Sequence, residues 1–286
     1  MNQNQLPGKS TKPEQNPLQS WVLAQTPPTW QMLVTPLERL VQGFEPISLM
    51  QMEAVALLNR TDTKFIMTQE NLLTALTALQ QDYWMLAVKD RRLNHYRTLY
   101  FDLPDFDLYR MNVNGRANRY KVRSREYTDS GLSFLEVKHK TSKGRTIKDR
   151  MQTQNPVIEM NSAFGTWLQE IFPVNYCCLE SKLWNTFTRL TLVNKLYPER
   201  VTLDVDLAFQ ANHRAIYLGG LVIAELKMDV CNERSPFWEQ MRAQHIHPRG
   251  FSKYCIGVAM TYEHVKKNSL KPKLRWIDKL TQGKAA

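Results

Sequence analysis

Cationic side chains occupy every second position of one segment in this sequence, and this spacing suits chemistry with anions. Residues 117–127 predict a strand, and its alternate positions hold Arg119, Lys121, Arg123 and Arg125. Side chains two apart in a strand lie on the same face of the sheet. Four like charges on one face repel each other, and a purely structural surface would mix the signs. We therefore interpret this face as the wall of a polyanion-binding site.

Charged side chains also alternate with apolar or uncharged ones in four other predicted strands, where carboxylates stand among the cations. The charged faces comprise Arg60, Asp62 and Lys64; Glu136, Lys138 and Lys140; Arg200, Asp204 and Asp206; and Glu225, Lys227 and Asp229. One such strand would be typical of a sheet with one face in water. Five together favour an enclosed space that the charged faces share. A carboxylate there would hold a divalent metal ion against phosphate oxygens.

The formal net charge of +11 over 286 residues favours a polyanionic partner. Nucleic acid, polyphosphate, a phosphorylated metabolite and an anionic membrane surface all fit that charge. Hydrophobic residues make up 43% of the chain, enough for a sizeable core. No apolar run approaches the ~20 residues of a membrane-spanning helix, and the N-terminus has no apolar stretch typical of a secretory signal. We therefore expect a cytoplasmic protein without a membrane span.

Hydrophobic periodicity predicts a series of mostly sequential strands with helices between them. Strands are expected at residues 60–68, 83–88, 95–102, 117–127, 133–141, 145–153, 180–194, 200–209, 214–218 and 221–230. Helical patterns occupy residues 30–59, 69–81, 106–111, 162–171 and 236–246, and another helix follows residue 252. The regular βαβ alternation of a parallel sheet is absent, and turns such as Gly219-Gly220 join neighbouring strands. The prediction is an α+β fold, an antiparallel β-barrel with flanking helices.

The predicted barrel also indicates how the charged faces are placed. The apolar faces of the strands need cover, which amphipathic helices would supply from outside. If the sheet closes, the charged faces line a tunnel, and closure removes the exposed strand edges. Cations in such a tunnel must be hydrated or filled by anions, because buried charges without counter-charges are too costly.

The chain divides by composition into one domain and two ends. Residues 31–265 carry the periodic segments and predict a single tunnel domain. Residues 1–30 are rich in Gln, Asn, Pro, Ser and Thr and predict a disordered or loosely attached arm. Residues 266–286 are expected to form a basic, mobile tail.

Several motifs in these strands and in the closing helix, in this order, resemble the VTC (vacuolar transporter chaperone) domain family, which belongs to the triphosphate tunnel metalloenzymes. The motifs are TLYFD at 98–102, RYKVRSREY at 119–127, FLEVK at 134–138, Gly144 with Lys148 and Arg150, RVTLD at 200–204, AELK at 224–227 and SKY at 252–254. A lone RxKxR or ExK would be a weak signal, whereas this many motifs in order are fairly specific. The resemblance extends over residues 45–262.

The resemblance implies a tunnel-shaped barrel and an enzyme that either polymerises inorganic polyphosphate from ATP or cleaves triphosphate compounds. It implies that Arg123, Arg125 and Lys138 act on the phosphates and that Glu225 holds Mn²⁺ or Mg²⁺. The further phosphate-binding residues are then Lys64, Lys121, Arg189, Arg200 and Lys253. Lys148 and Arg150 form a second tier of candidates, since the pattern fixes their inward orientation less firmly. Among the remaining carboxylates, we expect Asp204 to pair with Arg200 or its neighbours. Glu136 is expected either to orient Lys138 or Lys121 or to contact the metal.

One departure favours the polyphosphate polymerase branch of this superfamily. Tunnel hydrolases tend to carry ExExK in their first strand, where this chain has Arg60-Thr-Asp62-Thr-Lys64, with fewer metal ligands. We therefore predict transfer of the γ-phosphoryl group of ATP to a growing polyphosphate chain. A triphosphatase or NTPase of the same fold, and a non-catalytic polyphosphate- or RNA-binding module, remain alternatives. RNA is disfavoured because the neighbours of the cations are mostly ionic rather than aromatic. The oligomeric state stays open.

Overall fold

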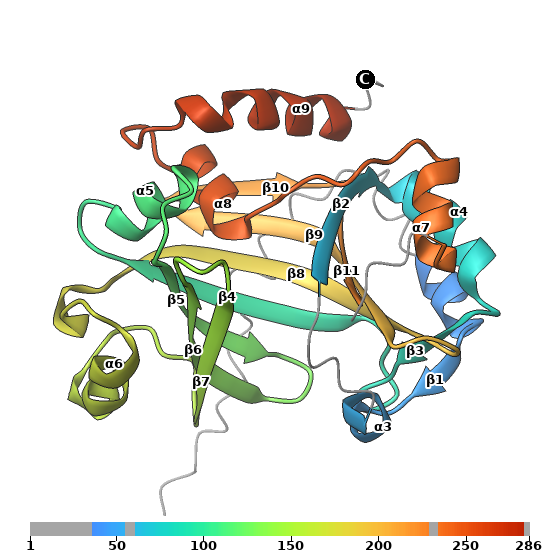
Figure 1. Ribbon diagram of the computed structural model, residues 1–286, viewed down its shortest axis with the longest axis horizontal. Helices are drawn as coiled ribbons and strands as arrows, with labels where there is room; N and C mark the ends of the chain where they lie inside the picture. The colour runs from blue at the N-terminus through green and yellow to red at the C-terminus, as the bar shows by residue number, and fades with distance from the viewer. Residues whose placement is uncertain (1–35, 55–60, 229–233, 283–286) are drawn as a thin grey trace, which may run out of the picture.

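One large sheet dominates the computed structural model, which describes residues 36–54, 61–228 and 234–282 (Figure 1). The predicted arm at 1–30 lies outside the described residues, as do Arg60 and Asp229. The strands are β1 (Glu45–Ile47), β2 (Thr61–Thr68), β3 (Tyr83–Leu86), β4 (Asn94–Asp102), β5 (Arg119–Tyr127), β6 (Leu132–Lys140), β7 (Thr146–Thr153), β8 (Glu180–Asn194), β9 (Glu199–Ala211), β10 (Arg214–Leu218) and β11 (Leu221–Met228). They form one 11-stranded sheet, and each predicted strand is present with ends shifted by a few residues.

The strands follow one another mainly as antiparallel neighbours. The main path through the sheet is β2-β11-β9-β8-β4-β5-β6-β7, while β10 pairs with β9, and β3 joins β8 to the parallel strand β1. No ladder joins β7 to β2 in the part of the chain that the structure describes. The prediction of an α+β fold with an antiparallel sheet and flanking helices is confirmed, but backbone hydrogen bonds do not close the sheet.

Helices cover the apolar faces of the strands from outside, as the sequence predicted. The helices are α3 (Leu49–Ala54), α4 (Gln69–Leu79), α5 (Asp107–Val113), α6 (Gly165–Ile171), α7 (Pro236–Ala243), α8 (Lys253–Thr261) and α9 (Lys271–Thr281), and residues 36–42 are also helical. On one side, α4 and α7 flank the sheet, and on another α5, α8 and α9 lie together (Figure 1). Leu72 and Leu76 of α4, each 1% exposed, share a buried cluster with Leu203 of β9. The charged faces are therefore left to the inside of the curved sheet.

Close packing of α8 against the sheet requires a glycine. A side chain at Gly257 would come within 2.5 Å of Leu183 and 2.6 Å of Phe209. These two residues belong to β8 and β9, so the glycine lets the helix backbone approach the strands closely. Lys253, at the first turn of the same helix, is thereby brought to the inside of the sheet.

Three segments differ from the sequence-based expectation. The helical pattern over 30–59 is interrupted by β1, because Glu45–Ile47 pairs with Trp84–Leu86 of β3. Residues 266–286, expected as a mobile tail, include α9, whose Ile277 is 0% exposed in the cluster that α8 also joins. Asp206 has a φ of 56° at an irregularity of β9, and its carboxylate contacts Thr188 and Tyr217. It therefore departs from the face of Asp204 that strict alternation predicted.

Candidate phosphate-binding site

The charged faces of strands far apart in the sheet converge on one space. Lys138 of β6 lies close enough to Glu225 of β11 and Lys64 of β2 for their charges to affect its ionisation. Lys64 likewise acts on Lys121 of β5. Because β2 and β6 are distant in the sheet order, the sheet must curl for these groups to meet. The wall formed by β5 and β6 therefore faces the wall formed by β2 and β11.

Glu136 is the counter-charge for three cations on the β5–β7 wall. Its side chain is 1% exposed and lies 2.6 Å from Arg123, 3.9 Å from Arg125 and 2.8 Å from Lys148. Burial opposes ionisation of Glu136, but the three cations hold its pKa well below the usual range. The expected pairing of Glu136 with Lys138 or Lys121 was wrong. In the ladder Arg123 lies directly opposite Glu136, whereas those two lysines lie opposite each other.

Asp204 plays the same part on the opposite wall. It accepts hydrogen bonds from Arg189 Nε at 2.5 Å and Nη2 at 2.8 Å, and Lys253 of α8 also contacts it. Burial disfavours the charged carboxylate, yet Arg189 and Lys253 hold its pKa well below the usual range. Asp204 therefore acts as an ion-pair partner, as the sequence favoured. Its partners are Arg189 and Lys253 rather than Arg200.

Glu225 is the candidate metal ligand, and its two oxygens each meet a lysine. Oε1 accepts from Lys64, and Oε2 accepts from Lys227 at 2.6 Å. Burial opposes its ionisation, but these lysines keep the pKa of Glu225 well below its usual range. The described residues contain no group of three His, Cys, Asp or Glu side chains that could hold a metal ion. A single ionised carboxylate fits a divalent ion that takes its other ligands from phosphate and water, provided that one lysine moves aside.

Three lysines of the site have pKa values close to neutrality. Burial lowers the pKa of Lys138, Lys148 and Lys227 to about 8, and neighbouring cations add to the effect. Lys121 and Lys253 shift in the same direction, again chiefly through burial. The crowded cations thus disfavour each other's charge, and an anionic ligand between them would relieve this repulsion.

Aromatic rings support the arginines of the site. The rings of Tyr96 and Phe187 stack with centroids 5.0 Å apart. The guanidinium of Arg189 lies 5.0 Å from the centroid of Tyr96, and that of Arg125 lies 5.7 Å from it. Lys253 Nζ is 4.3 Å from the ring of Phe187. These cation–π contacts fix the directions of the charged groups.

Residues 249–254, which we call the closing segment, connect several strands on the open side of the sheet. Arg249 N–H donates to the carbonyl of Lys64 in β2 at 2.7 Å. Lys121 Nζ of β5 donates at 2.9 Å to Ser252 Oγ, the N-cap of α8. In Figure 1 the chain between α7 and α8 passes in front of β2. The closing segment therefore joins β2 to β5, a connection that the backbone ladders lack.

A buried carboxylate outside the site holds the start of α8 in place. Asp102 is 0% exposed and accepts from the N–H groups of Leu103, Leu108 and Tyr109 at 2.7–2.8 Å. The hydroxyl of Tyr254 also donates to Asp102. Because Tyr254 follows Lys253 directly, this network positions the lysine that contacts Asp204.

The structure brings nine of the ten residues predicted to bind substrate or metal into one group, and Arg200, the tenth, lies on the face of the sheet that Lys227 also occupies. The nine are Lys64, Lys121, Arg123, Arg125, Lys138, Lys148, Arg189, Glu225 and Lys253. Arg200 lies opposite Lys227 in the β9–β11 ladder, and Arg150 packs its guanidinium 5.0 Å from the ring of Phe134. Sequence reasoning missed the site roles of Lys227 and Ser252. Both lie in motifs that it did single out, one beside Glu225 and one beside Lys253.

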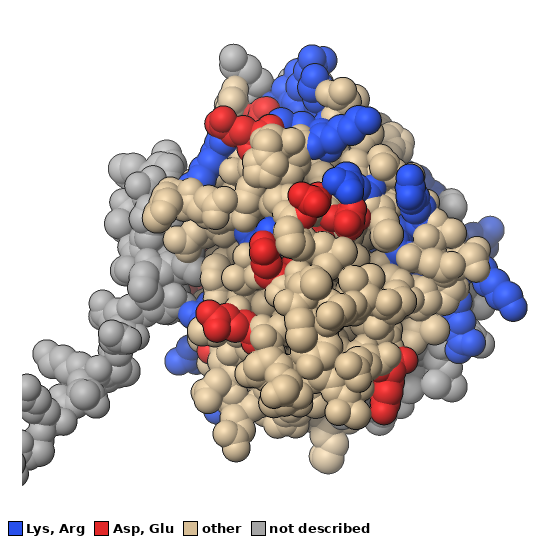
Figure 2. All heavy atoms as spheres, turned by 90° about the vertical axis from the view of Figure 1, so that its left-hand side faces the viewer, with Lys and Arg blue, Asp and Glu red and all other residues tan. Residues whose placement is uncertain are grey.

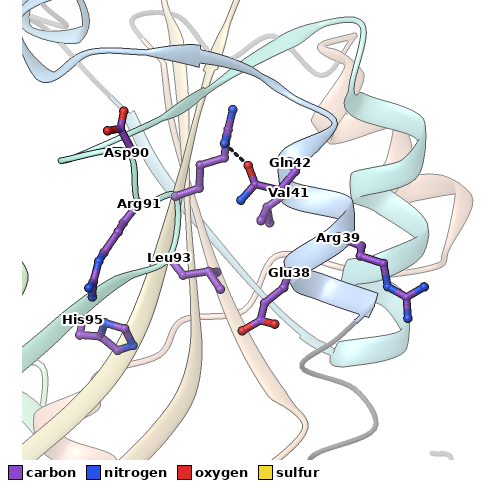
Figure 3. Close-up of a pocket in the computed structure, with 9 residues that line it drawn as sticks. Glu38, Arg39, Val41, Gln42, Asp90, Arg91, Leu93 and His95 are labelled. Carbon is purple, nitrogen blue, oxygen red and sulfur yellow. Dashed lines mark hydrogen bonds between the residues drawn. The ribbon is translucent and has the colours of Figure 1, made fainter.

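One cavity among the described residues lies away from the convergent site. A cavity of about 520 Å³ lies between the helix at 36–42 and the loop before β4 (Figure 3). Its lining includes Arg39, Arg91 and His95, and none of the predicted site residues. Figure 2 shows a face on which acidic and basic side chains are dispersed among uncharged ones. No helix in the described ranges is long and apolar enough to cross a membrane.

Solved structures with a similar arrangement come from several organisms. An adenylyl cyclase candidate from Hippeastrum, described as having a dominant triphosphatase activity, is 13% identical with a TM-score of 0.44, over 71% of this chain and 97% of its own. An adenylate cyclase candidate from Bacillus halodurans is 13% identical with a TM-score of 0.43, over 68% of this chain and 94% of its own. The PH1012 protein of Pyrococcus horikoshii is 12% identical with a TM-score of 0.36, over 71% of this chain and 99% of its own.

Sequence comparison identifies the family. No curated protein matches this chain. The VTC domain matches residues 59–262, which span β2 to the end of α8 and include every residue of the convergent site. The match covers more than half of the 286 residues, and it agrees with the motifs that first indicated the resemblance. The chain belongs to the VTC domain family.

Proposed function

We propose that this protein is a polyphosphate polymerase-like phosphotransferase, which transfers the γ-phosphoryl group of ATP to a growing polyphosphate chain. The observation that carries the proposal is the convergence of cations from both walls on one space. Among the described residues, the carboxylates that balance them are the buried Glu136, Asp204 and Glu225, together with Asp62, which lies opposite Lys227 in the β2–β11 ladder. This excess of positive charge suits a ligand with many negative charges.

The arginines supply the fixed part of phosphate recognition in this proposal. Arg123 and Arg189 are each oriented by a buried carboxylate, which leaves part of the guanidinium for phosphate oxygens. An arginine stays charged and can donate to two oxygens at once. The lysines with pKa values of about 8, among them Lys138, add charge that increases when an anion binds.

The proposed reaction needs alignment and charge neutralisation more than proton transfer. An oxygen of the terminal phosphate of the chain attacks the γ-phosphorus of ATP, and the bond to the β–γ bridging oxygen breaks to release ADP. A phosphate nucleophile is already ionised, so no protein base is required. The cations hold both phosphates in line and neutralise the charge that spreads in the transition state.

Glu225 is the residue that would hold the divalent ion, Mn²⁺ or Mg²⁺, once Lys64 or Lys227 moves aside. The ion, when bound, would neutralise negative charge on the phosphates. Lys64 and Lys227 would then be available to the same phosphates. Glu225→Gln keeps the size of the side chain but removes its charge, and we expect it to abolish the dependence of activity on Mn²⁺ or Mg²⁺.

Incubation of the protein with ATP and Mn²⁺ or Mg²⁺ tests the proposal. We expect long polyphosphate chains together with ADP, and loss of both in the double variant Arg123→Ala, Arg125→Ala. Removing one phosphate-binding arginine should cost about 3 kcal/mol of transition-state stabilisation. Release of inorganic phosphate without chains would instead assign a triphosphatase or NTPase. Tight binding of RNA that competes with triphosphate would assign a nucleic-acid-binding module.

A further inference from the structure

A second group of cations lies at the end of the β5–β6 wall, beyond the residues that Glu136 neutralises. We call them the outer cations, and they are Arg116, Arg119, Lys140, Lys143 and Arg145. Arg119 and Lys140 are direct partners in the β5–β6 ladder. Ser142 N–H donates to Asn118 Oδ1 at 3.0 Å, which holds the turn between β6 and β7 against the start of β5. The five cations therefore form one group.

The outer cations lack the counter-charges that the inner cations have. None of them makes an ion pair with a carboxylate within the residues described. Arg123, by contrast, pairs with Glu136, and Arg189 pairs with Asp204. Like charges directly opposite each other in a ladder are destabilising. Charged side chains at a hairpin tip in water are common. A tip with only a solubilising role would, however, mix both signs of charge rather than gather five cations without a carboxylate.

The outer cations continue the row that lines the site. Arg119, Lys121 and Arg123 alternate along β5 and so lie on one face, as do Lys140 and Lys138 along β6. The two ends of this row differ in exposure, because Arg125 is 7% exposed, Arg119 and Lys140 are half-buried, and Lys143 and Arg145 in the turn beyond them are exposed. The four residue steps from Arg123 to Arg119 span about 13 Å of strand. One positive track thus leads from the buried site to the outside.

We propose that the outer cations bind the part of a linear inorganic polyphosphate that extends beyond the buried site. This inference rests on the proposed function. It adds the path that a long polyphosphate chain takes over the surface of the protein. A triphosphate occupies the inner part of the row alone. A chain of many phosphates must leave the enclosed space, and the outer cations offer it matching charge at that point. Long chains therefore bind more tightly than triphosphate.

Binding measurements on one triple variant test this proposal. The variant combines Lys140→Ala, Lys143→Ala and Arg145→Ala, and its ligands are inorganic tripolyphosphate and long-chain linear polyphosphate. We expect the affinity for the long chain to fall roughly tenfold or more, and that for tripolyphosphate by less than about twofold, because salt screens charges a Debye length away. The matched control replaces Lys271, Arg275 and Lys279, exposed cations of α9, by alanine and should bind both ligands as the wild type does.

Different outcomes would overturn the inference and the proposed function. If the triple variant binds long chains as tightly as the wild type does, the inference alone is overturned. The same holds if the variant loses affinity equally for long chains and for tripolyphosphate. A similar loss in the α9 control would show an effect of net charge rather than of a track. Wild-type protein that binds neither anion overturns the proposed function as well. Single-stranded RNA that displaces the long chain but leaves tripolyphosphate bound would assign the outer cations to nucleic acid.

Discussion

Glu136 shows at the scale of single residues how an anion site is kept stable without its ligand. It is 1% exposed and compensates Arg123, Arg125 and Lys148. Glu136→Gln leaves these cations without their counter-charge, and breaking a buried ion pair costs about 3–5 kcal/mol. We expect urea unfolding to show a loss of this size. Tripolyphosphate should restore more stability to the variant than it adds to the wild type, since it supplies the missing charge.

The control for this prediction is Glu199→Gln. Glu199 is 2% exposed and accepts a hydrogen bond from Tyr83, and no cation of the described residues shifts its pKa. This variant should also lose stability, but tripolyphosphate should add no more to it than to the wild type. Equal ligand-induced stabilisation of the two variants would contradict the role of Glu136 as a counter-charge.

The lysines of the site predict how anion binding depends on pH. Lys138, Lys148 and Lys227 have pKa values of about 8 in the folded protein, against 10.5 as the ordinary value. Between these values the unfolded chain binds more protons, so the free energy of unfolding of the unliganded protein rises with pH. Anion affinity falls over the same window because the lysines lose their charge. Calorimetric titration with tripolyphosphate at pH 7 and 9 checks this, and Lys138→Arg should weaken the dependence.

At the residue scale, the sequence predicted side chains on regular strands and missed contacts between distant strands. The alternation Arg119, Lys121, Arg123 and Arg125 needs only the period of a strand, and the structure keeps it. The partners of Glu136 depend on the register of β5, β6 and β7, which no local pattern contains. The stack of aromatic rings that supports Arg125 and Arg189 depends on β4 and β8 lying side by side, for the same reason.

At the scale of elements, the start of α8 should govern how well Lys253 is placed. Tyr254→Phe removes the hydrogen bond to Asp102 but keeps the ring, which stacks 5.0 Å from Tyr100. Loss of one buried hydrogen bond costs about 1–3 kcal/mol. We expect lower thermal stability together with weaker binding of tripolyphosphate, because Lys253 is no longer held against Asp204.

Tyr262→Phe is the matched control for the Tyr254 variant. Tyr262 lies at the other end of α8, and its hydroxyl donates to the carbonyl of Lys182 at 2.6 Å. The control should lower stability to a similar degree and leave the affinity for tripolyphosphate unchanged. A similar loss of affinity in both variants would show that α8 acts through overall stability rather than through Lys253.

Elements with a strong local signal were predicted from the sequence, and elements that depend on tertiary contacts were not. β10 occupies residues 214–218 as predicted, because the Gly219-Gly220 turn fixes its end and Gly220 adopts a φ of 75°. β1 has only three residues and exists through its pairing with β3. In α9 the apolar side chains alternate with lysines and arginines, so the composition of the segment predicted a basic tail. The structure shows a helix there instead, with Ile277 buried.

At the scale of the whole molecule, the closing segment accounts for an enclosed site in an open sheet. The sequence predicted that charged faces converge, but it attributed the enclosure to closure by strands. Residues 249–254 connect β2 to β5 through a backbone bond at Lys64 and a side-chain bond from Lys121. A connection of this kind depends on where α7 and α8 pack, which is a property of the folded chain alone.

The charge of the whole molecule predicts the effect of salt on its two anionic ligands. Each phosphate that a cation neutralises releases counterions, so the logarithm of the affinity falls linearly with that of the salt concentration. A long polyphosphate that reaches both the buried site and the outer cations should show a steeper slope than tripolyphosphate. We expect titrations between about 50 and 200 mM KCl to separate the two ligands. The triple variant Lys140→Ala, Lys143→Ala, Arg145→Ala should bring the slope for the long chain close to that for tripolyphosphate. Parallel slopes in the wild type would mean that the long chain meets no more cations than the short one, and the track along β5 and β6 would then end at the buried site.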